Sequence, residues 1–132
     1  MAPAVSLELI IRAGAGVDNI DATYASNRGI YVTNCPGKNA LAVAELVFGL
    51  MITADRSIVE STNDLKNSIW NKGKYGNGKG MFGRTLGVVG SGFVGSEVIK
   101  RALVFGMKIV CVSLLLTYED AAEMVIRKTE SM

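Results

Sequence analysis

Three glycines with the spacing Gly-x-Gly-x-x-Gly, at Gly90, Gly92 and Gly95, are the residues of this chain best suited to chemistry. The first permits a tight turn after a strand, the second lets a ligand approach the backbone, and the third lets a helix pack close to the strand. The N–H groups that open such a helix, with the positive end of its dipole, bind phosphate. The pattern favours a dinucleotide-binding turn over a merely tight turn between a strand and a helix.

The residue that would normally bind the ribose of such a ligand is missing. An acidic residue about 20 positions past the glycines usually accepts a hydrogen bond from the ribose 2′-hydroxyl. Ser113 stands near that position, and its hydroxyl offers one hydrogen bond but no charge. The sequence therefore does not support a preference for NAD, it leaves NADP possible, and weak binding of either is the plainer alternative.

Other features of the composition exclude several functions. The chain has no histidine, so acid–base chemistry at neutral pH would need a perturbed Glu, Asp or Lys. The net charge is only +2 and the basic residues are scattered, which argues against nucleic acid as a partner. The two cysteines, Cys35 and Cys111, are too few for a disulfide scaffold or a zinc site. We interpret them as small apolar side chains in or beside strands and expect no metal and a reducing, intracellular setting.

The most apolar run, 40–54, predicts a helix that is buried on all sides, because apolar residues lie on nearly every face. It is interrupted by Glu45 and is shorter than the roughly 18–20 residues that cross a membrane, so we expect no membrane partner. The first residues have no pattern typical of a secretory signal. A mean hydropathy of +0.31 indicates apolar surface that another domain or subunit would cover.

The elements that must position these residues alternate between strand and helix, which predicts an α/β fold. A short helix is expected after Asp21 as N-cap and before Gly29 as the stop. Asn39 is a candidate cap for the helix over 40–54, and Thr117 for a last helix, with Asp120 completing a capping box. Strands are predicted over 7–12, 30–34, 86–90 and 108–112, and further helices over the first half of the polar stretch 55–83 and over 94–105; the second half of that stretch is expected to be an exposed loop.

Four stretches together resemble the D-isomer-specific 2-hydroxyacid dehydrogenases, in order and over about 7–112: "RAGAGVDNID", "RGIYVTNCPGKNALAVAELVFGLM", "LKNSIWNKGKY" and "GRTLGVVGSGFVG". The resemblance implies parts of two doubly wound, Rossmann-like parallel-sheet domains with the active site between them. Residues 1–39 would be the C-terminal part of a substrate-binding domain. Residues 40–132 would be the N-terminal part of a dinucleotide-binding domain, with an interdomain helix over 40–54 and a dimer-type arm over 58–84.

The resemblance also implies roles for residues near the start of the chain. Gly14 and Gly16 would face substrate, and Ala15 the nicotinamide, through backbone N–H groups; a plain tight turn is the alternative. Arg12 would pair with a carboxylate or phosphate, with simple solvation equally open. Asn39 would lie near the nicotinamide and substrate, a role that is compatible with capping the helix.

Phe93 and Val94 stand where the family makes backbone contacts to the pyrophosphate, alongside Gly90, Gly92 and Gly95. Ser113 stands where the family has its NAD-selecting acid. Trp70 would be a packing anchor in the arm that contacts a second subunit.

The activity implied by the resemblance is hydride transfer between NAD, or NADP, and C2 of a small 2-hydroxy acid such as 3-phosphoglycerate, in the cytoplasm. The family's catalytic Arg, Glu and His would lie beyond the region matched here, so we name no catalytic residue and expect the chain alone to be inactive. The alternatives are a nucleotide-binding or subunit-association module, which pairs with itself or with an intact subunit, and a truncated product with no function. A glyoxylate or hydroxypyruvate reductase relative is also open. Few strands and uncovered edges predict marginal folding.

Overall fold

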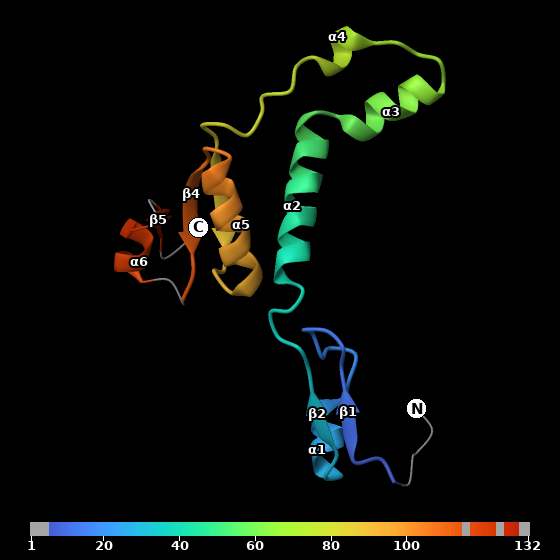
Figure 1. The fold of residues 1–132 in the computed structure, drawn as a ribbon, viewed down its shortest axis with the longest axis vertical. Coiled ribbons are helices and arrows are strands. Elements are labelled where there is room, and N and C mark those ends of the chain that lie inside the picture. Colours follow the sequence, from blue (N-terminus) through green and yellow to red (C-terminus); the bar gives the residue numbers. More distant parts are fainter. Residues whose placement is uncertain (1–5, 115–116, 124–125, 130–132) are drawn as a thin grey trace. The chain divides into compact units, whose positions relative to one another are not determined.

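The computed structural model describes residues 6–114, 117–123 and 126–129 (Figure 1). The chain divides into two compact units, Met1–Ala40 and Leu41–Met132. Each unit has its own parallel sheet, and each is described by itself below.

The first unit is a strand–helix–strand arrangement. Strands β1 (Leu9–Ile11) and β2 (Tyr31–Thr33) pair in parallel, and α1 (Ala22–Asn27) connects them. The predicted N-cap is confirmed, since the Asp21 carboxylate accepts a hydrogen bond of 2.8 Å from the backbone N–H of Tyr24. The predicted stop is confirmed too, because Gly29 follows the helix with a φ of +69°, which glycine adopts without strain.

The second unit contains a three-stranded parallel sheet in the order β3 (Thr85–Val89), β4 (Lys108–Val112), β5 (Ile126–Lys128). Helix α5 (Phe93–Val104) connects β3 to β4, and α6 (Tyr118–Glu123) connects β4 to β5 (Figure 1). The sequence predicts β4 with the bounds observed, and β3 and α5 to within one residue at each end. It does not predict β5. The capping box proposed for Thr117 and Asp120 rests partly on a side chain outside the described residues.

The core of this unit forms between the sheet and two helices. Helix α2 (Ala40–Asp55) contributes Ala44 and Phe48, which are four residues apart and therefore on one face. Phe48 stacks on Phe105, with ring centroids 5.0 Å apart. Buried partners from α5, β4 and their surroundings complete the cluster: Val98, Ile99, Ala102, Met107, Ile109, Cys111 and Ala121.

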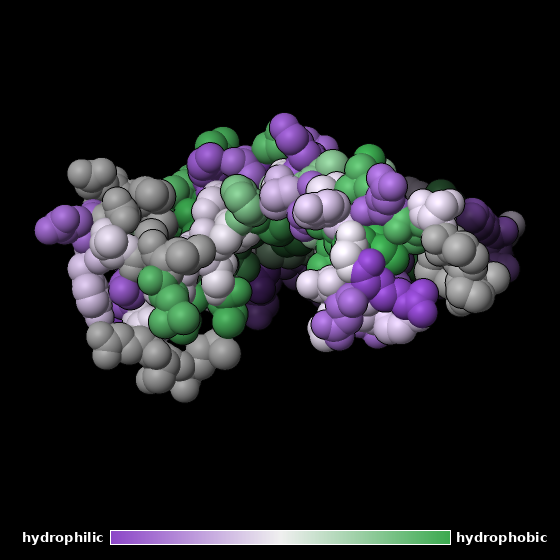
Figure 2. All heavy atoms as spheres, turned by 90° about the horizontal axis from the view of Figure 1, so that it is seen from below, coloured by the Kyte–Doolittle hydropathy of each residue, from purple (hydrophilic) through white to green (hydrophobic). Residues whose placement is uncertain are grey.

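The prediction that the helix over 40–54 is buried on all sides is wrong for this structure. Leu41, Leu46 and Leu50 on α2 are each more than half exposed. The face with Ala44 and Phe48 packs on the core, and among the described residues nothing covers the leucines on the other faces. Figure 2 shows hydrophobic side chains at the surface of the chain, as the mean hydropathy indicates.

The segment between α2 and β3 contains α3 (Ile58–Lys66) and the short α4 (Lys72–Tyr75). Helix α3 confirms the helix predicted for the first half of this stretch, whereas α4 lies in the half that is predicted to be a loop. Asp55, at the end of α2, fixes the chain before β3: its carboxylate accepts hydrogen bonds from Gly80 N–H (2.8 Å) and from the Arg84 guanidinium (2.7 Å). No helix among the described residues is both long and apolar enough to cross a membrane.

Candidate functional site

The glycine turn lies at the carboxyl end of β3, beside the end of β4. Gly90 continues the pairing of the two strands, because its N–H donates a 2.7 Å hydrogen bond to the carbonyl of Val112. Its φ of +91° is one that L side chains rarely adopt, so glycine is required for the chain to leave the sheet here.

Gly92 and Gly95 fit the two other roles that the spacing predicts. A Cβ at Gly95 would collide with the carbonyl oxygen of Gly90, so glycine is what lets α5 start close to β3. Gly92 is the N-cap of α5, and a Cβ there would meet no atom within 4 Å, so its backbone faces open space. Phe93 is exposed, whereas Val94 packs against the core cluster, so the first turn of α5 is anchored on one side only. An open glycine turn at the start of a helix is an arrangement that can bind phosphate.

Ser113 is linked to this turn. Its hydroxyl oxygen accepts a 3.2 Å hydrogen bond from the N–H of Ser91, and the two serine hydroxyls lie 2.6 Å apart. Ser91 in turn accepts a hydrogen bond at its carbonyl from the Ser96 hydroxyl, at 2.7 Å. The residue at the position of the missing acid thus ties the end of β4 to the glycine turn.

A pocket of about 670 Å³ opens at this edge of the sheet. Its lining combines the glycine turn, the end of β4 and the end of β5: Val89, Gly90, Ser91, Gly92, Val112, Ser113, Leu114, Lys128 and Thr129. The carboxyl edge of a parallel sheet is where open α/β folds bind ligands. Lys128 and Thr129 are functional candidates that sequence reasoning missed, because only the unpredicted strand β5 brings them to this edge. The sequence signal that could have indicated this strand is the β-branched and basic stretch 126–129, which follows a short helix.

The first unit gathers the other predicted residues. Arg12 N–H donates to the carbonyl of Thr33 at 2.8 Å, and the Arg12 side chain lies over Gly14, whose absent Cβ would be 3.3 Å from the guanidinium carbon. The Arg12 Nε is buried and has no hydrogen-bond partner among the described residues. An unpaired guanidinium N–H of this kind suits an anionic ligand.

The small-residue turn of this unit is partly paired with the protein itself. Gly14 N–H donates to the Arg12 carbonyl (2.8 Å), and the Ala15 carbonyl accepts from the Asn34 side-chain amide (2.7 Å). The absent Cβ of Gly16 would be 2.6 Å from a carboxylate oxygen of Asp18, so that position also requires glycine. Asn34 is thus a positioning contact that the sequence analysis did not single out.

Asn39 directly precedes α2 and is exposed. The hydrogen bonds recorded for the described residues include none from its side chain, so the capping role proposed for it is not seen. Asn39 and Arg12 belong to the first unit, whereas the glycine turn and Ser113 belong to the second.

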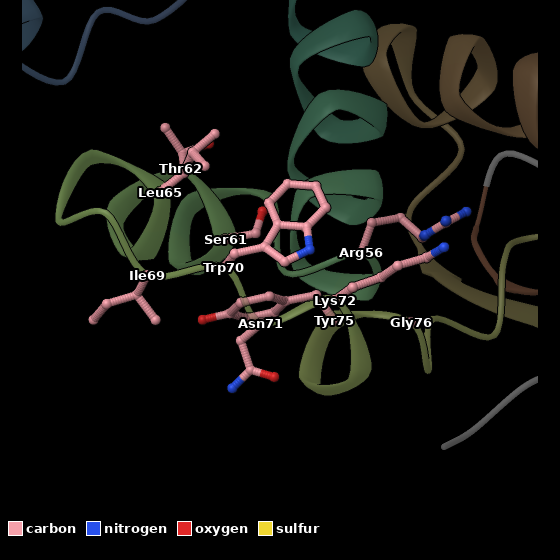
Figure 3. Close-up of a pocket in the computed structure, with 10 residues that line it drawn as sticks. All are labelled: Arg56, Ser61, Thr62, Leu65, Ile69, Trp70, Asn71, Lys72, Tyr75 and Gly76. Atoms are coloured by element: carbon pink, nitrogen blue, oxygen red, sulfur yellow. The ribbon is translucent and has the colours of Figure 1, made fainter.

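A second pocket, of about 550 Å³, lies along α3 and α4 (Figure 3). Trp70 lies in the middle of the labelled side chains, and Ile69 points away from them. Two polar contacts join the helices: the Asp64 carboxylate accepts a hydrogen bond from the Tyr75 hydroxyl at 2.5 Å and pairs with the Lys74 ammonium at 3.4 Å. The Tyr75 hydrogen bond, followed by the Lys74 contacts, lowers the pKa of Asp64 despite some desolvation. Apolar Trp70 in an exposed groove suits a packing surface better than a catalytic one.

The cysteines have the structural role that the sequence predicts. Cys111 is fully buried in β4, and this burial raises the pKa of its thiol, which makes it a poor nucleophile. Cys35 lies just past β2, and both thiols are free. Among the described residues no group of three or more His, Cys, Asp or Glu side chains could hold a metal ion.

A parallel sheet with a glycine turn at its carboxyl edge defines a Rossmann-like α/β unit, and the predicted fold class is confirmed. The family model of the D-isomer specific 2-hydroxyacid dehydrogenase catalytic domain matches residues 1–131, so the chain belongs to that family. The resemblance found in the sequence is confirmed, and membership implies a nicotinamide cofactor and a small 2-hydroxy acid substrate for the family.

Individual relatives agree with this assignment. The chain is 50% identical over 105 residues to a hydroxypyruvate reductase of Thermotoga maritima, covering 80% of this chain and 34% of the relative. It is 46% identical over 107 residues to a D-3-phosphoglycerate dehydrogenase of Methanocaldococcus jannaschii, covering 81% and 20%. The chain therefore spans between about a fifth and about a third of the length of these curated relatives.

A solved structure has the same fold. The D-lactate dehydrogenase of Aquifex aeolicus, in complex with NAD and lactic acid, is 30% identical with a TM-score of 0.79, covering 94% of this chain and 37% of that one.

Proposed function

We propose that this chain supplies the dinucleotide-binding part of an NAD(P)-dependent oxidoreductase that acts on the CH–OH group of a D-2-hydroxy acid. The observation that supports this most is the glycine turn at the carboxyl edge of β3 and β4, where Gly92 leaves open space at the start of α5 beside a pocket. Residues 1–39 are assigned to a substrate-binding domain, and 40–132 to a dinucleotide-binding domain.

The residues fit the cofactor at its phosphates. The turn Gly90–Gly95, with the backbone of Phe93 and Val94, would hold the pyrophosphate through the N–H groups that open α5. When bound, the nicotinamide supplies the hydride acceptor. In the first unit, Ala15 and Asn39 would lie toward the nicotinamide, and Gly14, Gly16 and Arg12 toward the substrate. The buried Nε of Arg12 supports a carboxylate or phosphate as its ligand.

The substrate we propose is 3-phosphoglycerate, oxidised to 3-phosphohydroxypyruvate in serine biosynthesis, in the cytoplasm. The D-3-phosphoglycerate dehydrogenase relatives support it, and two free cysteines agree with a reducing compartment. The hydroxypyruvate reductase relative makes reduction of glyoxylate or hydroxypyruvate the second candidate. Turnover of the two substrate classes by a complete enzyme that contains this segment would separate them.

The isolated chain is proposed to bind cofactor without turnover. Its sequence has no histidine to exchange a proton with the substrate hydroxyl, which is the usual role of that residue in catalysis at neutral pH. The test is a fluorescence titration of the folded 132-residue chain with NADH and NADPH, together with an assay for hydride transfer. Saturable binding without turnover supports the proposal. A chain that melts cooperatively but binds neither nucleotide contradicts it.

Association through the arm is the second part of the proposal. Trp70 is 78% exposed, and Leu65 and Ile69 beside it are at least half exposed. A second copy of this chain or an intact subunit of the same family would cover this surface.

A further inference from the structure

The end of β4 differs from a typical NAD site in two respects that the pocket brings together. The position that normally has a carboxylate has Ser113, whose hydroxyl faces the Ser91 N–H and hydroxyl. No acidic residue lines the pocket among the described residues. A carboxylate at this position accepts a hydrogen bond from a free 2′-hydroxyl and repels a 2′-phosphate, so its replacement removes the main barrier to the phosphate.

A positive charge lies at the same edge. Lys128 is the one charged residue that lines the pocket within the described part of the chain. Strand β5 runs parallel to β4 with Lys128 opposite Cys111, so Lys128 lies beside the last residues of β4. The Thr129 N–H donates to the Cys111 carbonyl at 2.9 Å, which holds the end of β5 against β4. The position of Lys128 is therefore fixed by strand pairing and does not depend on a loop.

The Lys128 ammonium is also oriented. Its Nζ lies 4.6 Å from the centroid of the Tyr118 ring, a cation–π contact from α6 that restricts the side chain. A restricted ammonium loses less entropy on binding an anion than a fully mobile one does. Burial of its strand neighbour Cys111 leaves the thiol neutral, so no nearby thiolate competes for the charge.

We propose that the pocket is selective for a nicotinamide dinucleotide that has a 2′-phosphate, with Lys128, Ser113 and the Thr129 hydroxyl as the phosphate contacts. The inference rests on the proposed function, since it specifies the cofactor of that site. Lysine binds phosphate as a point charge, and serine and threonine hydroxyls donate to phosphate oxygens.

The experiment is a pair of fluorescence titrations of the full 132-residue chain with NADPH and NADH at low salt. NADPH is expected to bind about tenfold more tightly, the equivalent of one charge-assisted hydrogen bond. The difference should shrink as salt is raised, because Lys128 is only half-buried and salt screens a charge pair that solvent can reach. Equal affinities, or tighter NADH, would overturn the inference and leave the proposed function intact. Binding of neither nucleotide would contradict the proposed function itself.

Two variants test the residues. K128M is expected to weaken the binding of NADPH by about tenfold and to leave the affinity for NADH nearly unchanged. The matched control is K108M, the same substitution at the opposite end of β4, where Lys108 is exposed and does not line the pocket. S113D should reverse the preference toward NADH. A K128M variant that keeps the NADPH preference would overturn the assignment of Lys128.

A competition on the unmodified chain does not depend on the folding of any variant. Adenosine 2′,5′-bisphosphate and 5′-AMP differ only in the 2′-phosphate, so both can occupy the glycine turn. The bisphosphate is expected to displace bound NADPH at about tenfold lower concentration. Equal potency of the two competitors would mean that no group in the pocket recognises the 2′-phosphate.

Discussion

Among single residues, Gly95 determines how closely α5 approaches β3. An added methyl group would collide with the carbonyl oxygen of Gly90, the residue that turns the chain off the sheet. G95A should therefore move the start of α5 or distort the turn, with a cost of about 1–3 kcal/mol in the free energy of unfolding. Helix propensity alone would favour alanine by up to about 1 kcal/mol, so the expected sign is opposite to that preference.

The matched control for G95A is G49A in α2, where a Cβ meets nothing within 4 Å. G49A should be neutral or stabilising in a urea titration followed by circular dichroism. Nucleotide titration provides the second measurement, because G95A should also weaken NADPH binding while G49A should not. Equal stability and affinity of the two variants would show that the close packing at Gly95 is not needed.

Asp55 is the residue that fixes the chain ahead of β3. Its side chain is only 9% exposed and accepts hydrogen bonds from Gly80 and Arg84. D55A leaves the Gly80 N–H without this acceptor and should lower the free energy of unfolding by about 1–2 kcal/mol, with the half-exposed Arg84 contributing little. Chemical denaturation measures this, with E60A on the exposed face of α3 as the control. A D55A variant as stable as E60A would contradict the assigned role.

The residues of the glycine turn were predictable because their constraints are local. The spacing of Gly90, Gly92 and Gly95 follows from a turn and a close approach, and the cap at Asp21 follows from the adjacent sequence. Lys128 was not predictable, because its place in the pocket depends on pairing between β4 and β5. The three residues of β5 are too few for their β-branched and basic character to predict a strand by itself.

At the scale of elements, α3 and α4 are joined by one carboxylate. The hydrogen bond from Tyr75 and the contacts from Lys74 lower the pKa of Asp64. A carboxylate whose pKa is lower in the folded than in the unfolded chain stabilises the fold at pH values above its unfolded-state pKa. This stabilisation is lost as the pH falls through its folded-state pKa. The joint between α3 and α4 should therefore open below about pH 4, the ordinary range of an aspartate.

Trp70 is the chain's single tryptophan and lies between these two helices, so its fluorescence reports on the joint. We expect its emission to change as pH falls below the ordinary aspartate range, and D64N to have the altered emission already at neutral pH. E60Q, on α3 but outside these contacts, is the control and should titrate like the parent chain. A D64N variant with the parent's acid transition would contradict the role of Asp64. Far-UV circular dichroism, recorded in parallel, separates opening of the joint from global unfolding.

Element boundaries show where local pattern is sufficient and where it is not. The limits of β4 agree with the prediction because its apolar run and the nearby Gly106, which follows the preceding helix, are local features. The all-round burial predicted for α2 is wrong, because apolar composition does not indicate which faces of a helix a neighbouring element covers. Leu46 and Leu50 remain exposed although they belong to the same apolar run as the buried Phe48.

At the scale of the whole molecule, many large apolar side chains of the described residues are exposed. The arm contributes Trp70, Leu65 and Ile69, and α2 contributes its exposed leucines. A two-stranded sheet and a three-stranded sheet each need covering elements for stability. Association is therefore the expected means by which this surface is buried.

The prediction at this scale concerns the arm. Sedimentation of the 132-residue chain should show concentration-dependent association. W70Q should weaken this association by about tenfold or more, because an aromatic anchor residue contributes roughly 2 kcal/mol at such contacts. The control is Y31Q, which removes an aromatic side chain of similar exposure (76%, against 78% for Trp70) from the first unit. If W70Q and Y31Q change association equally, the contact is not specific to the arm. If neither variant changes association, the exposed leucines of α2 become the surface to test, because contact between copies of the chain would then cover those leucines.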